Sequence, residues 1–536
     1  MQYGKTAKAL YNECETLRQT YLERARECSE LTIPTLVPPQ GHSFATKYVT
    51  PYQGIGARGV NNLASKLLLT LFPPNSPFFR LSVDRYKLIQ LGGDNEAKTE
   101  LEKALSEIER TVMREVETSA LRVPVFEALK HLVVAGNVLV VTPKEGGIRV
   151  FQLENYIVKR DPYGNVLHIV TKETVSPSVL PDDIKGQVNI EALQRQTGYN
   201  EPTIDLYTAV CRQEDGRFYV WQEAEGTAIP GTEGYFKEED NPYIPLRYSR
   251  VDGEDYGRGL VEEYLGDLKS LEALTQAIVK LAAASSNIKI LVDPNGTTKA
   301  KALAESPSGA FVSGRSNDVS VLQLEKFADL RVAKEVAEAI EQRLSFAFLL
   351  NAAVQRDAER VTAEEIRFMA QELEAALGGA YSILSQEFQL PLVTRIMDRM
   401  AKEKRLPKIP KGDLVKPMIV TGVEALGRGN DLSKLDMFVA GVGQIFGPEA
   451  IQQYVNVSDY LNRRATSLGI DTEGLIRSQE DVQAEAQAQQ QQMMMARMTE
   501  QLGPQAIRSA TETGMMQQQA EEAGEELPPE EEPPQS

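Results

Sequence analysis

The sequence LVEEYLGDLKSLEALTQAIVKLAAASS, residues 260–286, places an apolar residue at nearly every third or fourth position. This spacing predicts an amphipathic helix of about 24 residues, or ~36 Å at 1.5 Å per residue. FADLRVAKEVAEAIEQRLSFAFLL, residues 327–350, repeats the pattern and predicts a second helix. The residues expected to pack this helix pair are Leu268, Leu271, Ile278, Ile340 and Leu344. A charge placed at Leu271 is expected to destabilise the fold or its assembly, whereas one at the neighbouring Glu272 is expected to be tolerated.

Residues 287–325 separate the two helices and have a different pattern. The strand-like runs IKILV and VSVLQL enclose a DPNG turn at 293–296 and an SPSG turn. The sequence therefore predicts a small folded cap inserted between two helices, with boundaries near 260–286, 287–325 and 326–350.

The residues before the helix pair predict one α+β domain, 1–259. Helices are expected at about 5–29, 55–72, 96–118 and 124–135. From Asn137 onward, short runs such as YIVKR and FYVWQE predict an antiparallel sheet, and 176–202 reads as a polar insertion. The whole chain is thus expected to be mainly α with an α+β N-terminal domain.

The residues after the helix pair predict a loop and then a long helix. The loop spans 351–361, and Thr362 with Glu365 fits a capping box that opens a helix over 362–405. Gly378–Gly379 and Pro391 predict a kink in this helix. Short helices and turns are expected over 406–479, and a Gln/Met-rich helical or disordered segment with an acidic tail over 480–536.

Composition limits the classes of partner and compartment. Three scattered cysteines predict no disulfide framework, and the chain has no apolar run long enough for a membrane span, so we expect no membrane partner and folding inside the cell. The net charge is −18, whereas tight neutralisation of DNA phosphates requires clustered Lys and Arg. Any DNA partner is therefore expected to slide past the protein.

Motifs for catalysis or cofactors are weak. Gly54, Gly56 and Gly59 fit G-x-G-x-x-G, but Pro51 interrupts the preceding run and Phe79 stands where an acidic residue is needed. Close packing or a turn is the favoured interpretation of these glycines. The three histidines are His42, His131 and His168, and none has a partner at metal-ligand spacing. We predict no enzyme activity, metal or cofactor.

Several segments resemble the portal (head-to-tail connector) proteins of autographivirus-type short-tailed bacteriophages. They are YQGIGARGVNNLASKLLLTLFP, FEALKHLVVAGNVL, RDPYGNVL, YGRGLVEEYLGDLKSLEALTQAIVK, RLSFAFLLNAAVQRDAERVTAEEIRF, LGGAYSILSQEFQLPLV and TGVEALGRGNDLSKLD. The resemblance implies the portal fold of wing, stem, clip and crown, closed into a ring of about twelve copies. By this resemblance the wing is 1–259 with the helix 362–405, the stem helices enclose the clip, and the crown is 406–479.

The resemblance also implies a function and partners. The ring would occupy the portal vertex of a virion assembled in the host cytoplasm, contacting major capsid and scaffold proteins. The clip would dock terminase and later the tail adaptor, while double-stranded DNA passes without sequence specificity. The loop residues expected to line the channel are Asn351, Gln355, Arg356 and Arg360.

Two alternatives remain from the sequence. A non-channel oligomeric virion scaffold would need sustained heptads, which the Gly378–Gly379 break and the inserted cap interrupt. A nucleotide-dependent enzyme would rest on GIGARG alone, and binding of NAD or ATP would reveal it.

Overall fold

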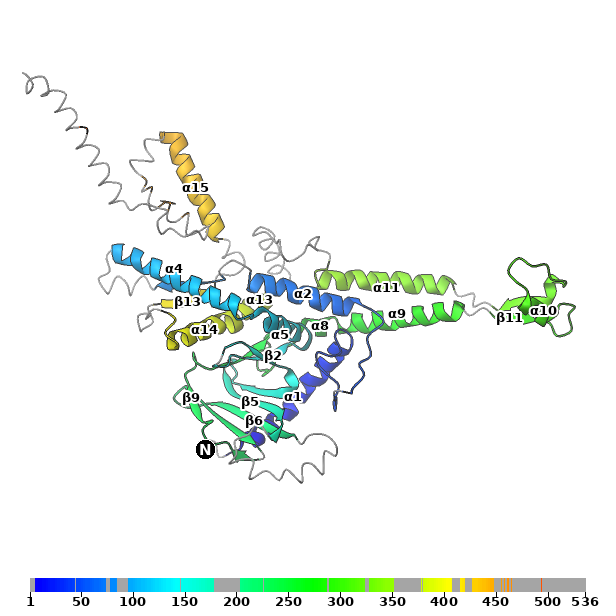
Figure 1. The fold of residues 1–536 in the computed structure, drawn as a ribbon, viewed down its shortest axis with the longest axis horizontal. Coiled ribbons are helices and arrows are strands. Elements are labelled where there is room, and N and C mark those ends of the chain that lie inside the picture. The colour runs from blue at the N-terminus through cyan, green and yellow to red at the C-terminus, as the bar shows by residue number, and fades with distance from the viewer. Residues whose placement is uncertain are drawn as a thin grey trace, which may run out of the picture. The chain divides into compact units, whose positions relative to one another are not determined.

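The structure is a computed structural model in two compact units, Met1–Ala425 and Leu426–Ser536. It describes residues 5–43, 45–73, 78–83, 95–144, 146–177, 203–224, 226–286, 289–322, 327–350, 377, 379–406, 415–419 and 427–447, with 455, 457, 460, 461, 464 and 493. The first unit contains both helices and antiparallel sheets (Figure 1), in agreement with the helical and strand-like segments predicted for it.

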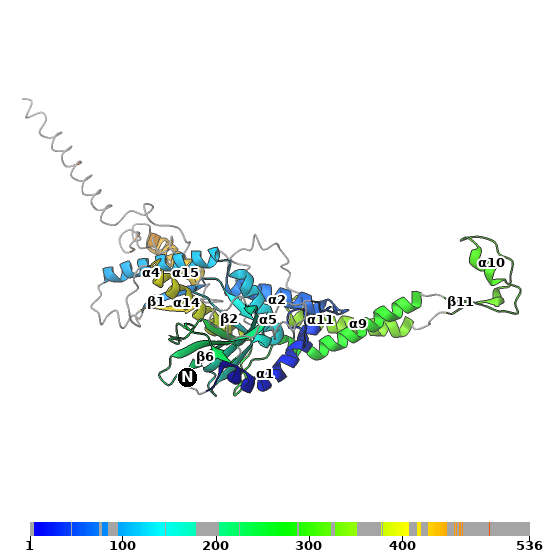
Figure 2. The ribbon, with the colours of Figure 1, turned by 60° about the horizontal axis from the view of Figure 1, so that its bottom comes forward.

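In the described part of the chain, four helices precede β2 (Asn137–Val141): α1 (Ala7–Glu30), α2 (Ile55–Leu71), α4 (Asn95–Thr118) and α5 (Arg122–Ala135). Each lies within about two residues of its predicted range, because apolar periodicity and terminal Pro or Gly residues are local signals. Thr6 caps α1 by accepting a hydrogen bond from the Ala9 N–H at 3.2 Å. In Figure 2, α1 lies next to the larger sheet, and it contacts several of its strands.

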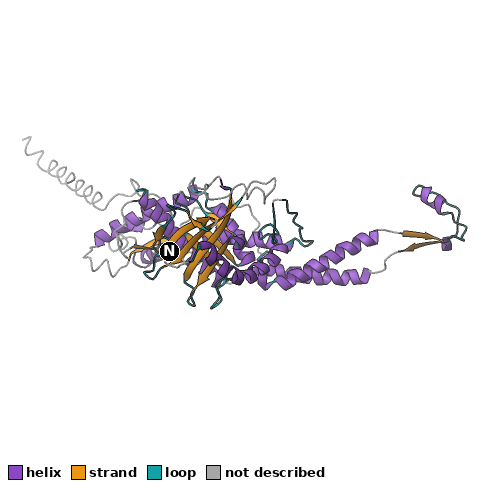
Figure 3. Cartoon of the chain, turned by 90° about the horizontal axis from the view of Figure 1, so that it is seen from below, coloured by secondary structure: helices purple, strands orange, loops and turns teal. Residues whose placement is uncertain are grey.

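The larger sheet is antiparallel, with the order β4-β5-β6-β7-β8 and β9 also paired with β7. Its strands are β4 (Tyr156–Arg160), β5 (Val166–Val175), β6 (Ile204–Arg212), β7 (Phe218–Ala224), β8 (Thr227–Ala228) and β9 (Gly234–Phe236). A short 3-10 turn, Leu153–Asn155, leads into β4. The antiparallel sheet predicted after Asn137 is confirmed (Figure 3).

Two smaller sheets connect distant parts of the first unit. β2 (Asn137–Val141) pairs with β3 (Arg149–Phe151) and β10 (Tyr243–Arg247). β1 (Phe79–Val83) pairs with β13 (Val415–Ile419), a pairing that no local pattern predicted. The chain returns after more than three hundred residues to complete that sheet.

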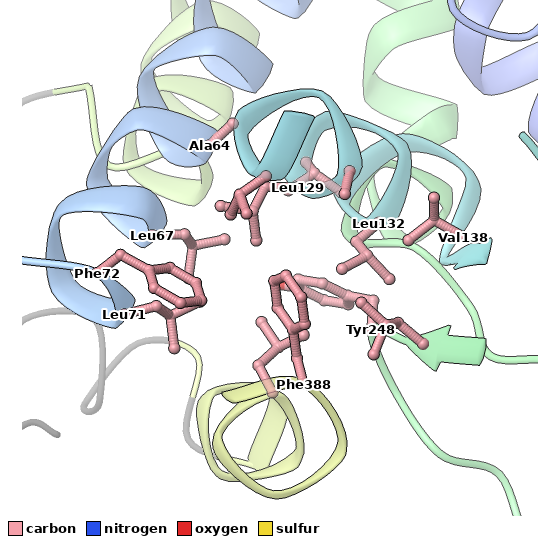
Figure 4. Packing of buried hydrophobic residues seen from close by; sticks show 14 of the residues in the cluster. Ala64, Leu67, Leu71, Phe72, Leu129, Leu132, Val138, Tyr248 and Phe388 are labelled. Carbon is pink, nitrogen blue, oxygen red and sulfur yellow. The ribbon is translucent and has the colours of Figure 1, made fainter. Parts of the chain in front are cut away.

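The main hydrophobic core packs α2, α5 and β10 against the helical residues after 379. Figure 4 shows Leu67 from α2, Phe72 directly after it, Leu129 from α5 and Phe388 pointing toward one another. The Phe72 ring meets that of Phe388 edge-on, with centroids 5.5 Å apart. At the end of α5, Gly136 has φ +72, and a Cβ there would lie 2.4 Å from the backbone at Arg258, so glycine is required.

The predicted helix pair is present as α9 (Leu265–Ser286) and α11 (Phe327–Ala347), which lie side by side (Figure 1). The first predicted helix is interrupted: α8 (Leu260–Glu263) ends at Tyr264 before α9 begins. Between α9 and α11, β11 (Lys289–Val292) pairs with β12 (Val319–Leu322). A short helix, α10 (Ala300–Glu305), and a 3-10 turn, Ser316–Asp318, complete this module.

A π-helical turn interrupts the α-helical hydrogen-bonding pattern within the range of the predicted long helix. After α13 (Gly379–Leu384), residues Ser385–Gln389 form this turn, and α14 (Leu390–Lys402) follows. Pro391 stands in the first turn of α14, directly after the π-helical turn, and it has no N–H to donate to the preceding helical turn. Residues 351–376 and 480–536, apart from 493, lie outside the described part of the chain.

The second unit contains α15 (Gly427–Phe446), a helix of 20 residues. The prediction of short helices and turns over 406–479 is wrong here. Its sequence, GRGNDLSKLDMFVAGVGQIF, contains four glycines, which lower the intrinsic helix propensity and hide the helix from a local pattern.

Candidate subunit interface

The base of the α9–α11 pair is buried in the main core. Leu268, Leu344, Leu271 and Ile340 are 0%, 0%, 4% and 6% exposed, whereas Ile278, further along α9, is only partly buried. Arg343 of α11 also forms an ion pair with Asp267 of α9 at 2.9 Å. Of the five residues expected to pack the pair, four thus lie in the core and Ile278 lies at its margin.

Other faces of the two helices leave apolar side chains in solvent. Val279 of α9 and Val332, Val336 and Phe346 of α11 are exposed, and Phe346 is 75% exposed. Ion pairs within α11, such as Lys334 with Glu338 at 3.6 Å, stand beside these apolar residues. Exposed apolar side chains grouped on a helix pair are typical of a surface that another protein covers.

The β11–β12 module has no apolar core of its own among its described side chains, residues 290–320. Thr298 is the buried residue there, and Ile290, Leu291 and Phe311 are exposed. Polar contacts hold the module instead: one Asp318 carboxylate oxygen accepts hydrogen bonds from the backbone N–H groups of Thr297 and Thr298 at 2.7 and 3.0 Å. It also accepts from both threonine hydroxyls, at 3.0 and 3.1 Å.

Comparison with known proteins identifies the family. The model of the bacteriophage head to tail connecting protein family matches residues 4–476. The chain belongs to this family. It is 45% identical to the portal protein of Escherichia phage T7 over 91% of both chains, and 43% identical to that of Enterobacteria phage T3 over 89% of both. The predicted membership of the autographivirus-type portals is confirmed.

A solved structure described as "Neck of empty GTA particle computed with C6 symmetry" is also similar to the chain. The match covers 83% of this chain and 94% of that one, with a TM-score of 0.39 and 12% sequence identity.

In this head-to-tail connecting protein, Glu272 binds a distant part of the backbone. Its two carboxylate oxygens accept hydrogen bonds from the backbone N–H groups of Tyr52 and Gln53, at 3.0 and 3.1 Å. Residues more than two hundred positions earlier thus fold against Glu272, and the expected tolerance of a change there stays a prediction. This contact ties α9 to the segment that leads into α2.

The GIGARG glycines serve packing in the connector. A Cβ on Gly56 would lie 2.5 Å from the Leu31 carbonyl oxygen, and one on Gly59 would lie 2.5 Å from the Phe348 ring. Gly54 precedes α2 as its N-cap residue. The predicted interpretation of close packing therefore accounts for Gly56 and Gly59.

Titratable groups in the connector are shifted mainly by burial. Burial, aided by the nearby Lys130 charge, lowers the pKa of His131 to about 4. Burial also lowers the pKa of His168. Burial and a hydrogen bond with Asp240 raise the pKa of Asp398 to about 6. Burial alone moves a pKa in these directions, because it disfavours the charged form, so the shifts by themselves indicate no catalytic site.

Several predicted site residues lie outside the described part of the chain. They are the channel-loop residues Asn351, Gln355, Arg356 and Arg360 and the capping pair Thr362 and Glu365. Within the described ranges, no helix is both long and apolar enough to cross a membrane. The same ranges contain no group of three His, Cys, Asp or Glu side chains placed to hold a metal ion.

Proposed function

We propose that this chain forms a dodecameric ring at one vertex of a capsid and acts as the conduit for double-stranded DNA during packaging and ejection. The observation that carries this proposal is the 45% identity to a portal protein across 91% of both chains. The apolar side chains that α9 and α11 leave exposed support ring closure, since neighbouring copies would remove them from water.

The proposed division of the chain follows the portal architecture. The wing comprises 1–259 and the helix 362–405, the stem comprises 260–286 and 326–350, the clip is 287–325, the channel loop is 351–361 and the crown is 406–479. The β11–β12 module falls within the clip and the α9–α11 pair within the stem. The β11–β12 hairpin inserted between two paired helices supports this assignment.

The channel is proposed to let DNA slide. A net charge of −18 gives few phosphate anchors over the whole chain, so sequence-independent binding stays weak. Arg356 and Arg360, repeated around a ring, would form rows of positive charge that contact phosphates transiently. Asn351 and Gln355 would add neutral hydrogen-bonding groups beside them. The ring itself is proposed to hydrolyse nothing.

The clip is proposed to dock terminase during packaging and then the tail adaptor. Its described side chains bury almost no apolar surface, and Phe311 is fully exposed, so this module has apolar area available for partners. Major capsid and scaffold proteins would contact other parts of the ring within the virion, which assembles in the host cytoplasm.

Electron microscopy of the purified protein tests the ring. End-on views should show a closed ring with a central hole, whereas a monomer at high concentration or an open filament would contradict the proposal. The filament would instead support the non-channel scaffold. Arg360→Ala should then leave rings intact and reduce the DNA retained in filled heads, measured by nuclease protection. Unchanged retention would remove the proposed role of the loop arginines.

A further inference from the structure

The C-terminal end of α11 lies in a polar contact with α2. The Asn62 side-chain amide donates hydrogen bonds to the carbonyl oxygens of Phe348 and Leu349, at 3.0 and 3.1 Å. The Lys66 ammonium donates to the Leu349 carbonyl oxygen at 2.8 Å. The last carbonyls of a helix have no partner within it and carry partial negative charge. Asn62 and Lys66 therefore supply the hydrogen-bond donors, and Lys66 the positive charge, that the carbonyl groups of this helix end lack.

Gly59 extends the same contact by letting the Phe348 ring approach the α2 backbone. Phe348 is fully buried, and its ring occupies the space that a Cβ at position 59 would need. Gly59, Asn62 and Lys66 are spaced by three and four residues, so they follow one face of α2. We call these three residues the α2 socket.

The helix end held by the α2 socket has an unusual backbone. The Leu350 N–H donates to the Ser345 carbonyl and the Leu349 N–H to the Phe346 carbonyl, which is the Schellman pattern of a helix C-terminus. That pattern needs a left-handed residue, usually glycine, and here Leu349 takes it with φ +54. A leucine in this conformation persists only where its surroundings hold it.

We propose that Asn62 and Lys66 are positioning residues that fix where, and in which direction, the chain leaves α11. The socket connects the end of α11 to α2, which is itself packed into the main core against α5. A shift of the core would therefore move the exit at Leu350. The biological consequence rests on the proposed function, in which the segment after Leu350 meets DNA.

Hydrogen exchange on assembled rings tests the socket itself. Asn62→Leu and Lys66→Met remove donors while keeping similar side-chain volume, and Asn61→Leu is the matched control, because Asn61 is exposed one position away. Asn62→Leu and Lys66→Met each remove hydrogen bonds to the end of α11. Each should therefore raise the exchange rate of the Leu349 and Leu350 amides roughly tenfold. Asn61→Leu should leave it unchanged. Lys66→Arg, which keeps a charged donor, should restore part of the protection.

Phage carrying the same variants test the positioning role. Asn62→Leu and Lys66→Met should form rings with unchanged subunit number and near-normal melting temperature, yet lose several-fold of the DNA retained in filled heads. Unchanged exchange at Leu349 and Leu350 would overturn the socket. Faster exchange with normal packaging and retention would overturn its positioning role. Absence of rings or filled heads in the unmodified protein would instead be a failure of the proposed function.

Discussion

The main core and the β11–β12 module show two different ways of specifying structure in one chain. In the core, Leu63, Leu129 and Leu132 are completely buried between α2, α5 and the sheets. In the module, a single carboxylate, Asp318, organises two threonines while Phe311 stays in water. Apolar burial is the main stabilising term of folding, so we expect the core to be stable within one subunit and the module to depend more on any partner that covers it. The α9–α11 pair combines both: Leu268 and Leu344 are completely buried in the core, whereas Val279, Val336 and Phe346 are exposed.

The largest expected effect lies at the buried base of the pair. Leu271→Asp places an unpaired carboxylate in the core and should destabilise the subunit by about 4 kcal/mol or more, enough to prevent folding. Leu271→Met keeps the volume and should cost less than about 1.5 kcal/mol. Urea unfolding followed by circular dichroism measures both, and a stable Leu271→Asp subunit would contradict the assignment of this region to the core.

An intermediate effect is expected from His131 inside the core. Its folded-state pKa of about 4 lies below the ordinary value, so the unfolded chain binds more protons between these two values. The stability from neutral His131 is fully present above about pH 6.5 and is lost as pH falls toward 4, by at most ~3 kcal/mol. His131→Leu should remove that part of the pH dependence of the unfolding free energy.

Comparing the unfolding free energies of the unmodified protein and His131→Leu at pH 7 and pH 4.5 separates the effect of His131 from that of other groups. Asp398, whose pKa is raised, contributes in the opposite direction and is present in both. If the unfolding free energy of both proteins falls equally between pH 7 and pH 4.5, the pKa of His131 is not lowered in the folded subunit.

The smallest effect on subunit stability is expected at the exposed valines of α11. The same change should have a large effect on assembly. Val336→Asp changes a side chain that is 45% exposed and should alter the unfolding free energy by less than about 0.5 kcal/mol. It should nevertheless reduce ring formation, measured by analytical ultracentrifugation, because a charge would enter the surface that a neighbour covers. Lys334→Asp, on the charged part of α11, is the control for an added carboxylate. Normal rings from Val336→Asp would place the interface elsewhere.

Local patterns in the sequence determined most of the helices, the antiparallel strands after Asn137 and the module inserted between α9 and α11. These features depend on apolar periodicity, turn residues and breakers within a few positions of each other. The same signals favour packing or a turn for GIGARG, since no strand or acidic residue stands at the required distance, and the close contacts of Gly56 and Gly59 agree with packing.

Only the tertiary structure decided which side chains meet across long stretches of chain. The β1–β13 pairing, the contact of Glu272 with the Tyr52 and Gln53 backbone, and the α2 socket all join residues more than two hundred positions apart. In the sequence, Glu272, Asn62 and Lys66 look like solvated polar positions on helices. These side chains have partners because the end of α11 and the segment before α2 bring backbone groups next to them, and such groups need hydrogen-bond partners. No local sequence pattern predicts these long-range contacts.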